Sequence, residues 1–158
     1  MAKGNEIIVS DQPRGVYHEG IVSGTPKPGT VMQVKAATEP VAGAFTFEVY
    51  NPDADGNQRL QYVLLPDSLQ GKLATAAYVS GDRCFLYVPA PGEDLNMLVA
   101  NIAGTGDAFA IGDKLMVDDG TGKLIATTGT PESEPYEVME TVAAITADTL
   151  VWVRHTGY

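Results

Sequence analysis

The stretch GAFTFEVYNPDADGNQRLQYVLL, residues 43–65, decides the fold class. Apolar side chains alternate with polar or mixed ones from Phe45 to Val49, and a period of two is typical of a β-strand with one buried face. A segment rich in Asn, Pro, Asp and Gly follows at 51–57 and is typical of a loop, and the apolar run 60–65 resumes after it. The stretch therefore predicts a strand, a loop and a returning strand.

Similar short runs recur along the rest of the chain and indicate roughly eight to eleven strands. The 17 Gly and 10 Pro are spread over the whole length, which favours many turns over long helices. One passage, 66–78, has a helical pattern, with Asp67 or Ser68 as the cap, but Gly71 limits it to one short turn. We expect an all-β fold with little helix: an extended N-terminal arm at 1–14 and a single β-sandwich or β-barrel-like domain of antiparallel strands at 15–158.

The charge balance argues against two classes of partner. The net charge is −10, and the few basic residues form no cluster, whereas nucleic acids and anionic membranes are bound through clustered Lys and Arg. No apolar stretch has the length of a signal peptide or of a membrane span, which takes about 20 residues. We therefore expect no nucleic-acid partner, no membrane partner and synthesis in the cytoplasm.

Two loops resemble ligand-binding motifs, and both fail in detail. Gly122-Lys123 looks like a phosphate-binding loop, but Val117 and Leu124 replace its first glycine and its hydroxyl residue. The segment 51–56 resembles the start of a calcium loop, but Tyr62 replaces the closing glutamate. Both segments are interpreted as hairpin turns, and we expect no metal and no cofactor.

Catalytic patterns are also absent, so we expect no enzyme and no catalytic residues. Cys84 lies in an apolar run and is interpreted as a buried, inert thiol. His18 and His155 lack the spacing of a metal site, and surface positions are expected for both. Adjacent acids such as Glu93 and Asp94 point to opposite faces of a strand, and so do not form an acid–base pair.

A short pattern occurs twice, at Gly81-Asp82 and at Gly112-Asp113, each followed by a basic residue and a strand-like run. Glycine tolerates positive φ, and an aspartate side chain can accept bonds from nearby backbone N–H groups. Each pair is predicted to form a tight turn that begins a strand. Two copies do not define a repeat architecture.

The C-terminal segment carries a family resemblance. The segment AFAIGDKLMVDDGTGKLIATTGTPESEPYEVMETVAAITADTLVWVRHTGY, 108–158, resembles the C-terminal half of the head decoration, or cement, proteins of tailed bacteriophages. It has their Gly-Asp-x-Leu strand, Gly-rich hairpin, Thr-rich return and final Val-x-Val-Arg strand in order. The upstream VPAPGEDLNMLVA, 88–100, is similar to their Pro-Gly-Glu loop and strand. The likeness covers residues 80–158.

The resemblance implies a structural protein that binds the outer surface of the capsid and stabilises it, commonly as trimers at three-fold or quasi-three-fold positions. It implies the major capsid protein and further copies of the chain as partners, and a place on the virion. Ile7, Ile8 and Val9 form a short apolar strand with no obvious local partner, and adding it to a neighbour's sheet would satisfy its backbone. We assign partner binding to Ile7, Ile8, Val9 and Arg14, and expect deletion of 1–13 to leave the domain folded but weaken assembly.

A second class of function stays open at this point. An acidic β-sandwich could instead be a non-enzymatic module that recognises carbohydrate or protein through loops such as 51–57 and 89–94. Trp152 and the tyrosines would then supply stacking surfaces. Most of these aromatic residues lie in strand-like runs, where burial is the commoner outcome.

Overall fold

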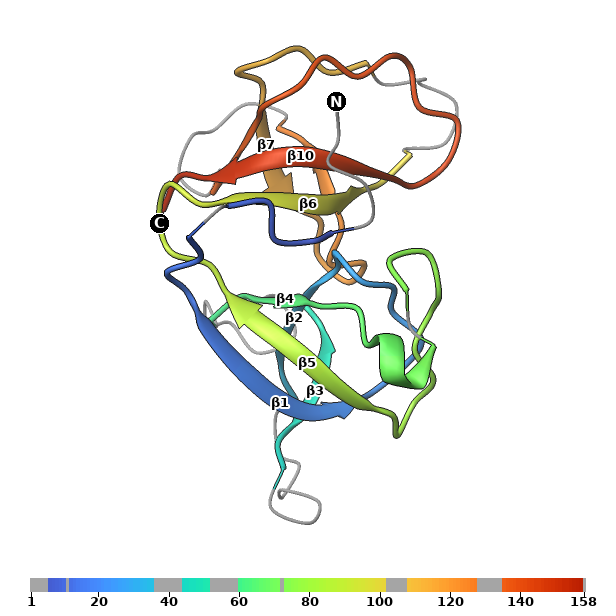
Figure 1. Ribbon diagram of the computed structural model, residues 1–158. Coiled ribbons are helices and arrows are strands. Elements are labelled where there is room, and N and C mark those ends of the chain that lie inside the picture. The colour runs from blue at the N-terminus through green and yellow to red at the C-terminus, as the bar shows by residue number, and fades with distance from the viewer. Residues whose placement is uncertain are drawn as a thin grey trace.

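The protein consists of two small β-barrels stacked one on the other (Figure 1). The computed structural model describes residues 6–10, 12–35, 44–51, 60–71, 73–101, 108–127 and 135–157. The strands in these parts are β1 (Val16–Val22), β2 (Val31–Val34), β3 (Thr46–Val49), β4 (Tyr62–Leu64), β5 (Arg83–Val88), β6 (Asp94–Val99), β7 (Lys114–Val117), β8 (Leu124–Ala126), β9 (Tyr136–Val138) and β10 (Thr149–His155). The all-β, barrel-like prediction is confirmed.

Each barrel is built from five consecutive strands. The first closes in the order β1-β3-β2-β4-β5, and the second in the order β10-β6-β8-β7-β9. In both, the first and third strands pair in parallel, β1 with β3 and β6 with β8, while the other pairings are antiparallel. If the strands are numbered within each barrel, both close in the cyclic order 1-3-2-4-5. The chain thus repeats one topology.

The Gly-Asp turns have the predicted geometry. Gly81 and Gly112 have φ values of 97° and 95°, and the side chains of Asp82 and Asp113 accept bonds of 2.8 Å from the N–H groups three residues earlier. They precede β5 and β7, which are the fifth strand of one barrel and the second strand of the other. The sequence echo is therefore local turn chemistry and does not mark the repeat of the fold.

The strand pairing of the first barrel differs from the prediction. Residues 46–49 and 62–64 form β3 and β4 as expected, but β2 lies between them and pairs with both. Met32 is the partner of Val49 on one side and of Tyr62 on the other. The returning strand β4 therefore pairs with the earlier strand β2 and not with β3, because β2 lies between β3 and β4.

The predicted helical turn is a 3-10 helix, η2 (Ser68–Gln70). The Asp67 side chain caps it by accepting a bond of 3.0 Å from the N–H of Leu69, and Gly71 ends it. The remaining potential helix over 66–78 does not form in its described residues, which agrees with the cost of glycine inside a helix.

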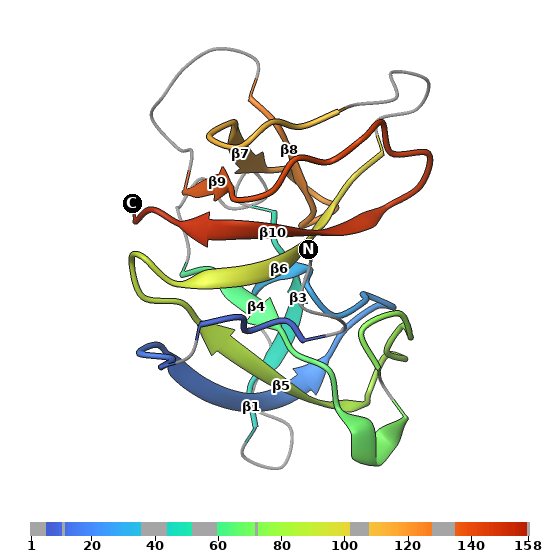
Figure 2. The same ribbon diagram turned by 45° about the horizontal axis from the view of Figure 1, so that its top comes forward.

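Two groups of apolar side chains form the core. One fills the first barrel and includes Phe47, Tyr78, Cys84 and Leu86. The other fills the second barrel and continues across the junction into outward-facing side chains of the first, among them Val31, Val63, Phe85 and Tyr87. Figure 2 shows the two barrels meeting at one surface, called the seam below. The seam is part of the hydrophobic core, because the second apolar group extends across it.

Candidate functional site

The N-terminal arm lies in the seam, beside β6 (Figures 1 and 2). The side chains of Ile7 and Val9 are 2% and 7% exposed and belong to the core, and Ile8 packs against its margin. Hence the structure gives these residues an apolar environment within their own chain. Their predicted role in binding another subunit stays a prediction.

Backbone bonds hold the arm on the edge of β6. The N–H of Asn96 donates to the carbonyl of Ile7 at 2.7 Å, and the N–H of Val9 donates to the carbonyl of Asp94 at 2.9 Å. The Ser10 hydroxyl accepts a bond from the N–H of Asp94 at 2.8 Å. The expectation that this stretch lacks a local partner is wrong, because the arm pairs with the start of β6, whereas β8 pairs with its end at Val99.

Arg14 and Gly15 end the arm at a buried carboxylate, that of Glu93. The backbone N–H of Arg14 donates to Glu93 Oε1, that of Gly15 donates to the same oxygen at 3.2 Å, and that of Ala90 donates to Oε2 at 2.6 Å. The Tyr87 hydroxyl lies 2.7 and 2.8 Å from the two oxygens. Glu93 thus joins the arm, β5 and β6 at the point where the chain passes between the barrels.

The electrostatics of this cluster favour a charged glutamate beside a neutral tyrosine. Burial alone would raise the pKa of Glu93, but the bonds from Arg14, Tyr87, Ala90 and Gly15 favour the carboxylate and lower the pKa below 4.5. Burial and the bond to Glu93 raise the pKa of Tyr87 well above its usual range. The Glu93 side chain is 1% exposed, so its carboxylate is committed to the protein's own backbone.

His155 lies in the same region, and its predicted surface position is wrong. It is 1% exposed, its ring centroid lies 5.4 Å from that of Tyr136, and its backbone N–H and carbonyl bind the turn at residues 92 and 93. Burial lowers the pKa of His155, although the Ala90 backbone and the charge of Glu93 oppose the shift. The imidazole is therefore kept neutral.

The loop between β7 and β8 has a role beyond the predicted hairpin turn. It does connect two paired strands, but its tip contacts the first barrel. The carbonyl of Gly122 accepts a bond of 2.7 Å from the N–H of Val31, and the N–H of Gly120 donates to the carbonyl of Tyr50 at 3.1 Å. A Cβ at position 122 would lie 2.3 Å from the Val31 carbonyl oxygen. Glycine allows this loop to join the two barrels.

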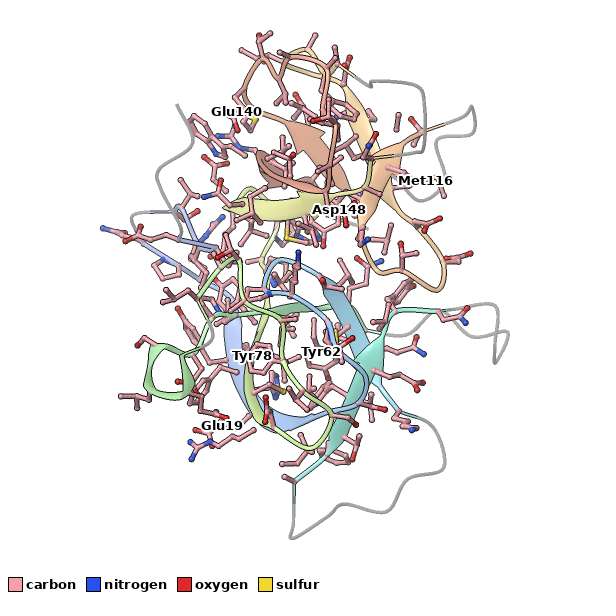
Figure 3. All side chains as sticks on the ribbon, turned by 90° about the vertical axis from the view of Figure 1, so that its right-hand side faces the viewer. Glu19, Tyr62, Tyr78, Met116, Glu140 and Asp148 are labelled. Carbon is pink, nitrogen blue, oxygen red and sulfur yellow. The ribbon has the colours of Figure 1, made fainter. Side chains whose placement is uncertain are left out.

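A groove of about 280 Å³ opens beside this loop at the seam. It is lined by Thr25, Pro26, Lys27, Thr30, Val49, Leu98, Thr121, Lys123 and Asp148. The first barrel supplies the loop before β2 and part of β3, and the second supplies part of β6, the β7–β8 loop and the residue before β10. Figure 3 shows Asp148 at this level between the barrels.

The groove contains one ion pair and one further cation. Lys123 Nζ lies 2.6 Å from Asp148 Oδ2. Burial would raise the pKa of Asp148, but the bond from Lys123, the N–H of Asn101 and the charge of Lys27 lower it. The lining contains threonines but no aromatic residue. Its chemistry suits a small hydrogen-bonding or anionic group better than a sugar ring.

The remaining candidate residues lie apart from the groove. Cys84 is fully buried, as predicted, and burial raises the pKa of its thiol to about 12. His18 is half-buried, with its ring edge-on to Tyr62 at 5.3 Å. Asp94 pairs with Arg154 at 2.8 Å while Glu93 points inward, so these neighbouring acids do face opposite ways.

The alternative binding module would depend on Trp152 and on loops such as 51–57. Trp152 is half-buried on β10, opposite Asn96 of β6. The calcium-like segment 52–56 lies outside the described residues.

Within the described ranges, no group of three or more His, Cys, Asp and Glu side chains is placed to hold a metal ion. No described helix has the length and apolar character to cross a membrane.

Comparison with known proteins yields a structural match. No protein-family model and no curated protein sequence matches the chain. Its structure is similar to the head fiber gp8.5 N base of bacteriophage phi29, with a TM-score of 0.51 and 12% sequence identity over 91% of this chain and 98% of that one. The chain thus shares its fold with a bacteriophage head protein, which agrees with the sequence resemblance to phage head proteins.

Proposed function

We propose that this protein is a structural component of a tailed-bacteriophage head, bound to the outer surface of the capsid as a decoration, or cement, protein. The observation that carries the proposal is the fold shared with the head fiber base of phi29, which extends over nearly the whole of both chains. The order of the turns and strands in residues 80–158 supports it independently. The proposed role is structural and requires no catalysis.

The interior of the molecule is suited to a structural role, because it holds the two barrels in a fixed arrangement. Both barrels, the arm and the β7–β8 loop are tied together by buried apolar contacts and backbone hydrogen bonds at the seam. Many copies, each attached through a modest contact, would stabilise a closed shell through multivalency. The major capsid protein is the proposed partner, and the proposed site is the outer surface of the virion.

We further propose that the protein acts as a homotrimer at three-fold or quasi-three-fold positions. This part rests on the family resemblance. A trimer at such a position would match the symmetry of the shell, so that one contact type is used three times. Of the four arm residues assigned to partner binding, Ile8 and Arg14 remain accessible to a neighbour, Ile8 at the margin of the core and Arg14 at the end of the arm.

Reconstitution on capsids tests the proposal. Purified protein would be mixed with capsids that lack it, pelleted with the shells and located by electron microscopy. We expect saturable binding and added density on the outer surface at three-fold or quasi-three-fold positions. Absence of binding would overturn the capsid role, whereas single copies at other positions would overturn the trimer alone.

A further inference from the structure

We propose that the groove at the seam holds a carboxylate-bearing side chain of the capsid shell, and that Lys27 is the residue that pairs with it. The inference rests on the proposed function for the identity of the partner. It adds the contact surface and the chemistry that this surface recognises, neither of which follows from the fold alone.

Lys27 differs from most basic residues of the described part of the chain. Arg83, Lys114, Lys123 and Arg154 each form an ion pair at 2.6 to 2.9 Å. Lys27 is exposed at the groove and, in the described part of the chain, forms no such pair. In a protein with a net charge of −10, an available ammonium group at a concave surface is suited to a contact with an anion.

The charges of the groove define the ligand further. Lys27 and Lys123 contribute two positive charges, and Asp148 contributes one negative charge, which leaves one positive charge. A single carboxylate would neutralise it. Thr25 is exposed in the lining and supplies a hydroxyl group that can donate to a remaining carboxylate lone pair, whereas the Thr121 hydroxyl already donates to Asp118.

The size and surroundings of the groove favour a protein side chain over other anions. About 280 Å³ is more than a lone ion requires and is enough for a side chain with its adjoining backbone. A polyanion such as DNA would be repelled by the net charge of −10. The proposed partner is the capsid shell, so the shell is the favoured source of the carboxylate, and the test below distinguishes it from a second copy of the chain.

The groove also depends on the relative position of the barrels. Its lining comes from separate segments of both, and the Gly122 contact fixes the β7–β8 loop that carries Thr121 and Lys123. The site is therefore formed before binding. A preformed site loses little conformational entropy when its partner docks.

Charge reversal at Lys27 tests the inference. Capsid binding would be measured by quantitative co-sedimentation for the wild type, Lys27→Glu and Lys35→Glu. Lys35 is a matched control, because it follows the other end of β2, its ammonium group lies 3.3 Å from the Ser23 hydroxyl, and it is not one of the residues that line the groove. We expect Lys27→Glu to weaken binding at least about tenfold, with a weaker dependence on salt, and Lys35→Glu to change it by less than about threefold.

The outcomes separate this inference from the proposed function. Capsid binding by Lys27→Glu as tight as that of the wild type would overturn the inference and leave the capsid role intact. Failure of the wild type to bind would overturn both. If Lys27→Glu instead lowered the mass of the protein in solution, the groove would hold a second copy, and the assignment to the shell would be wrong. Lys27→Met, which removes the charge without reversing it, and the melting temperature of each variant exclude misfolding as the cause.

Discussion

Glu93 brings three segments of the chain together at one side chain. Its carboxylate accepts bonds from the end of the arm, just before β1, from the end of β5 and from the turn before β6, and it lies in the interior. Buried carboxylates are stable where several donors replace water. The Pro-Gly-Glu loop of the sequence resemblance is therefore a structural junction, and its acid is not available to an external ligand.

Glu93→Gln should destabilise the protein by about 1 to 3 kcal/mol at neutral pH, because an amide nitrogen then faces N–H donors that lose their acceptor. The loss should shrink on acidification. The folded-state pKa of Glu93 is lowered below 4.5, so its stabilisation is present above that pH and is lost as the pH falls further. Urea unfolding of both proteins at about pH 7 and about pH 3 measures the effect.

Glu19→Gln is the matched control for this prediction. Glu19 is 60% exposed and pairs with Arg83 on the surface, where ion pairs contribute little. If Glu93→Gln and Glu19→Gln had equally small effects on the unfolding free energy at neutral pH, the carboxylate would not be a structural junction.

His155 should make stability fall with acidification at a higher pH than Glu93 does. Its folded-state pKa is depressed below 6.5 by burial, so the unfolded chain takes up a proton first as the pH decreases. The free energy of unfolding therefore decreases from about pH 6.5 downward. His155→Phe should flatten this part of the profile between about pH 7 and about pH 5. An unchanged slope in His155→Phe, or the same flattening in His18→Phe, would contradict the assignment.

At the scale of the elements, the β7–β8 loop has a contact with the first barrel that its sequence does not predict. Its strands, glycines and polar residues predict a hairpin turn, and the hairpin is present. Its contact with the first barrel depends on residues some seventy to ninety positions earlier, such as Val31 and Tyr50. Short-range patterns carry no information on such a contact.

Substitutions of two glycines in this loop distinguish the need for a positive φ from the need for close contact with the first barrel. Gly120 and Gly122 have φ values of 85° and 61°, but a Cβ at 120 would meet nothing within 4 Å, whereas one at 122 would lie 2.3 Å from the Val31 carbonyl oxygen. Gly120→Ala should cost about 1 to 2 kcal/mol through backbone strain. Gly122→Ala should cost more than that, because the loop must also leave the first barrel. Equal unfolding free energies for the two variants would show that the contact contributes nothing.

The sequence predicts those features of the fold that depend on neighbouring residues, and it does not predict those that depend on contacts between distant parts of the chain. The Gly-Asp turns, the capped turn at Asp67 and the presence of a strand at β3 depend on neighbouring residues and are predicted correctly. The single buried face expected from Phe45 to Val49 does not form, because Phe47 is buried while Phe45 is 55% exposed. The insertion of β2 between β3 and β4 depends on which strands meet across a barrel. Likewise, the division into two barrels of equal topology left no recognisable repeat in the sequence, because topology constrains hydrophobic pattern and turns but not residue identity.

The groove was not predicted for a related reason. Lys27, Lys123 and Asp148 lie on three loops that only the stacking of the barrels brings together. None of them forms a motif with its neighbours in sequence. Lys123 follows Gly122 in the segment that resembles a phosphate-binding loop, and that pattern carries no information on the ion pair of Lys123 with Asp148.

For the whole molecule, the decisive feature is that one apolar cluster runs through the second barrel, the arm and the facing side of the first barrel. Val31 and Val63 are fully buried, although they point away from the interior of their own barrel. Separating the barrels would expose these side chains and would break the backbone bonds made by Gly122 and the arm. Burial of this kind favours a single cooperative unit over two independent ones.

We therefore expect one thermal unfolding transition, with a calorimetric enthalpy equal to the van't Hoff enthalpy. Ile7→Ala is the informative variant, because Ile7 belongs to the arm and contributes a buried side chain to the shared cluster. It should destabilise the entire protein by about 2 to 5 kcal/mol and shift the transition without dividing it. Ile8→Ala, at the margin of the same cluster, should cost distinctly less. Two resolved transitions in the wild type, or an Ile7→Ala variant in which one barrel melts earlier while the other is unaffected, would mean that the barrels fold independently and that the arm belongs to one of them alone.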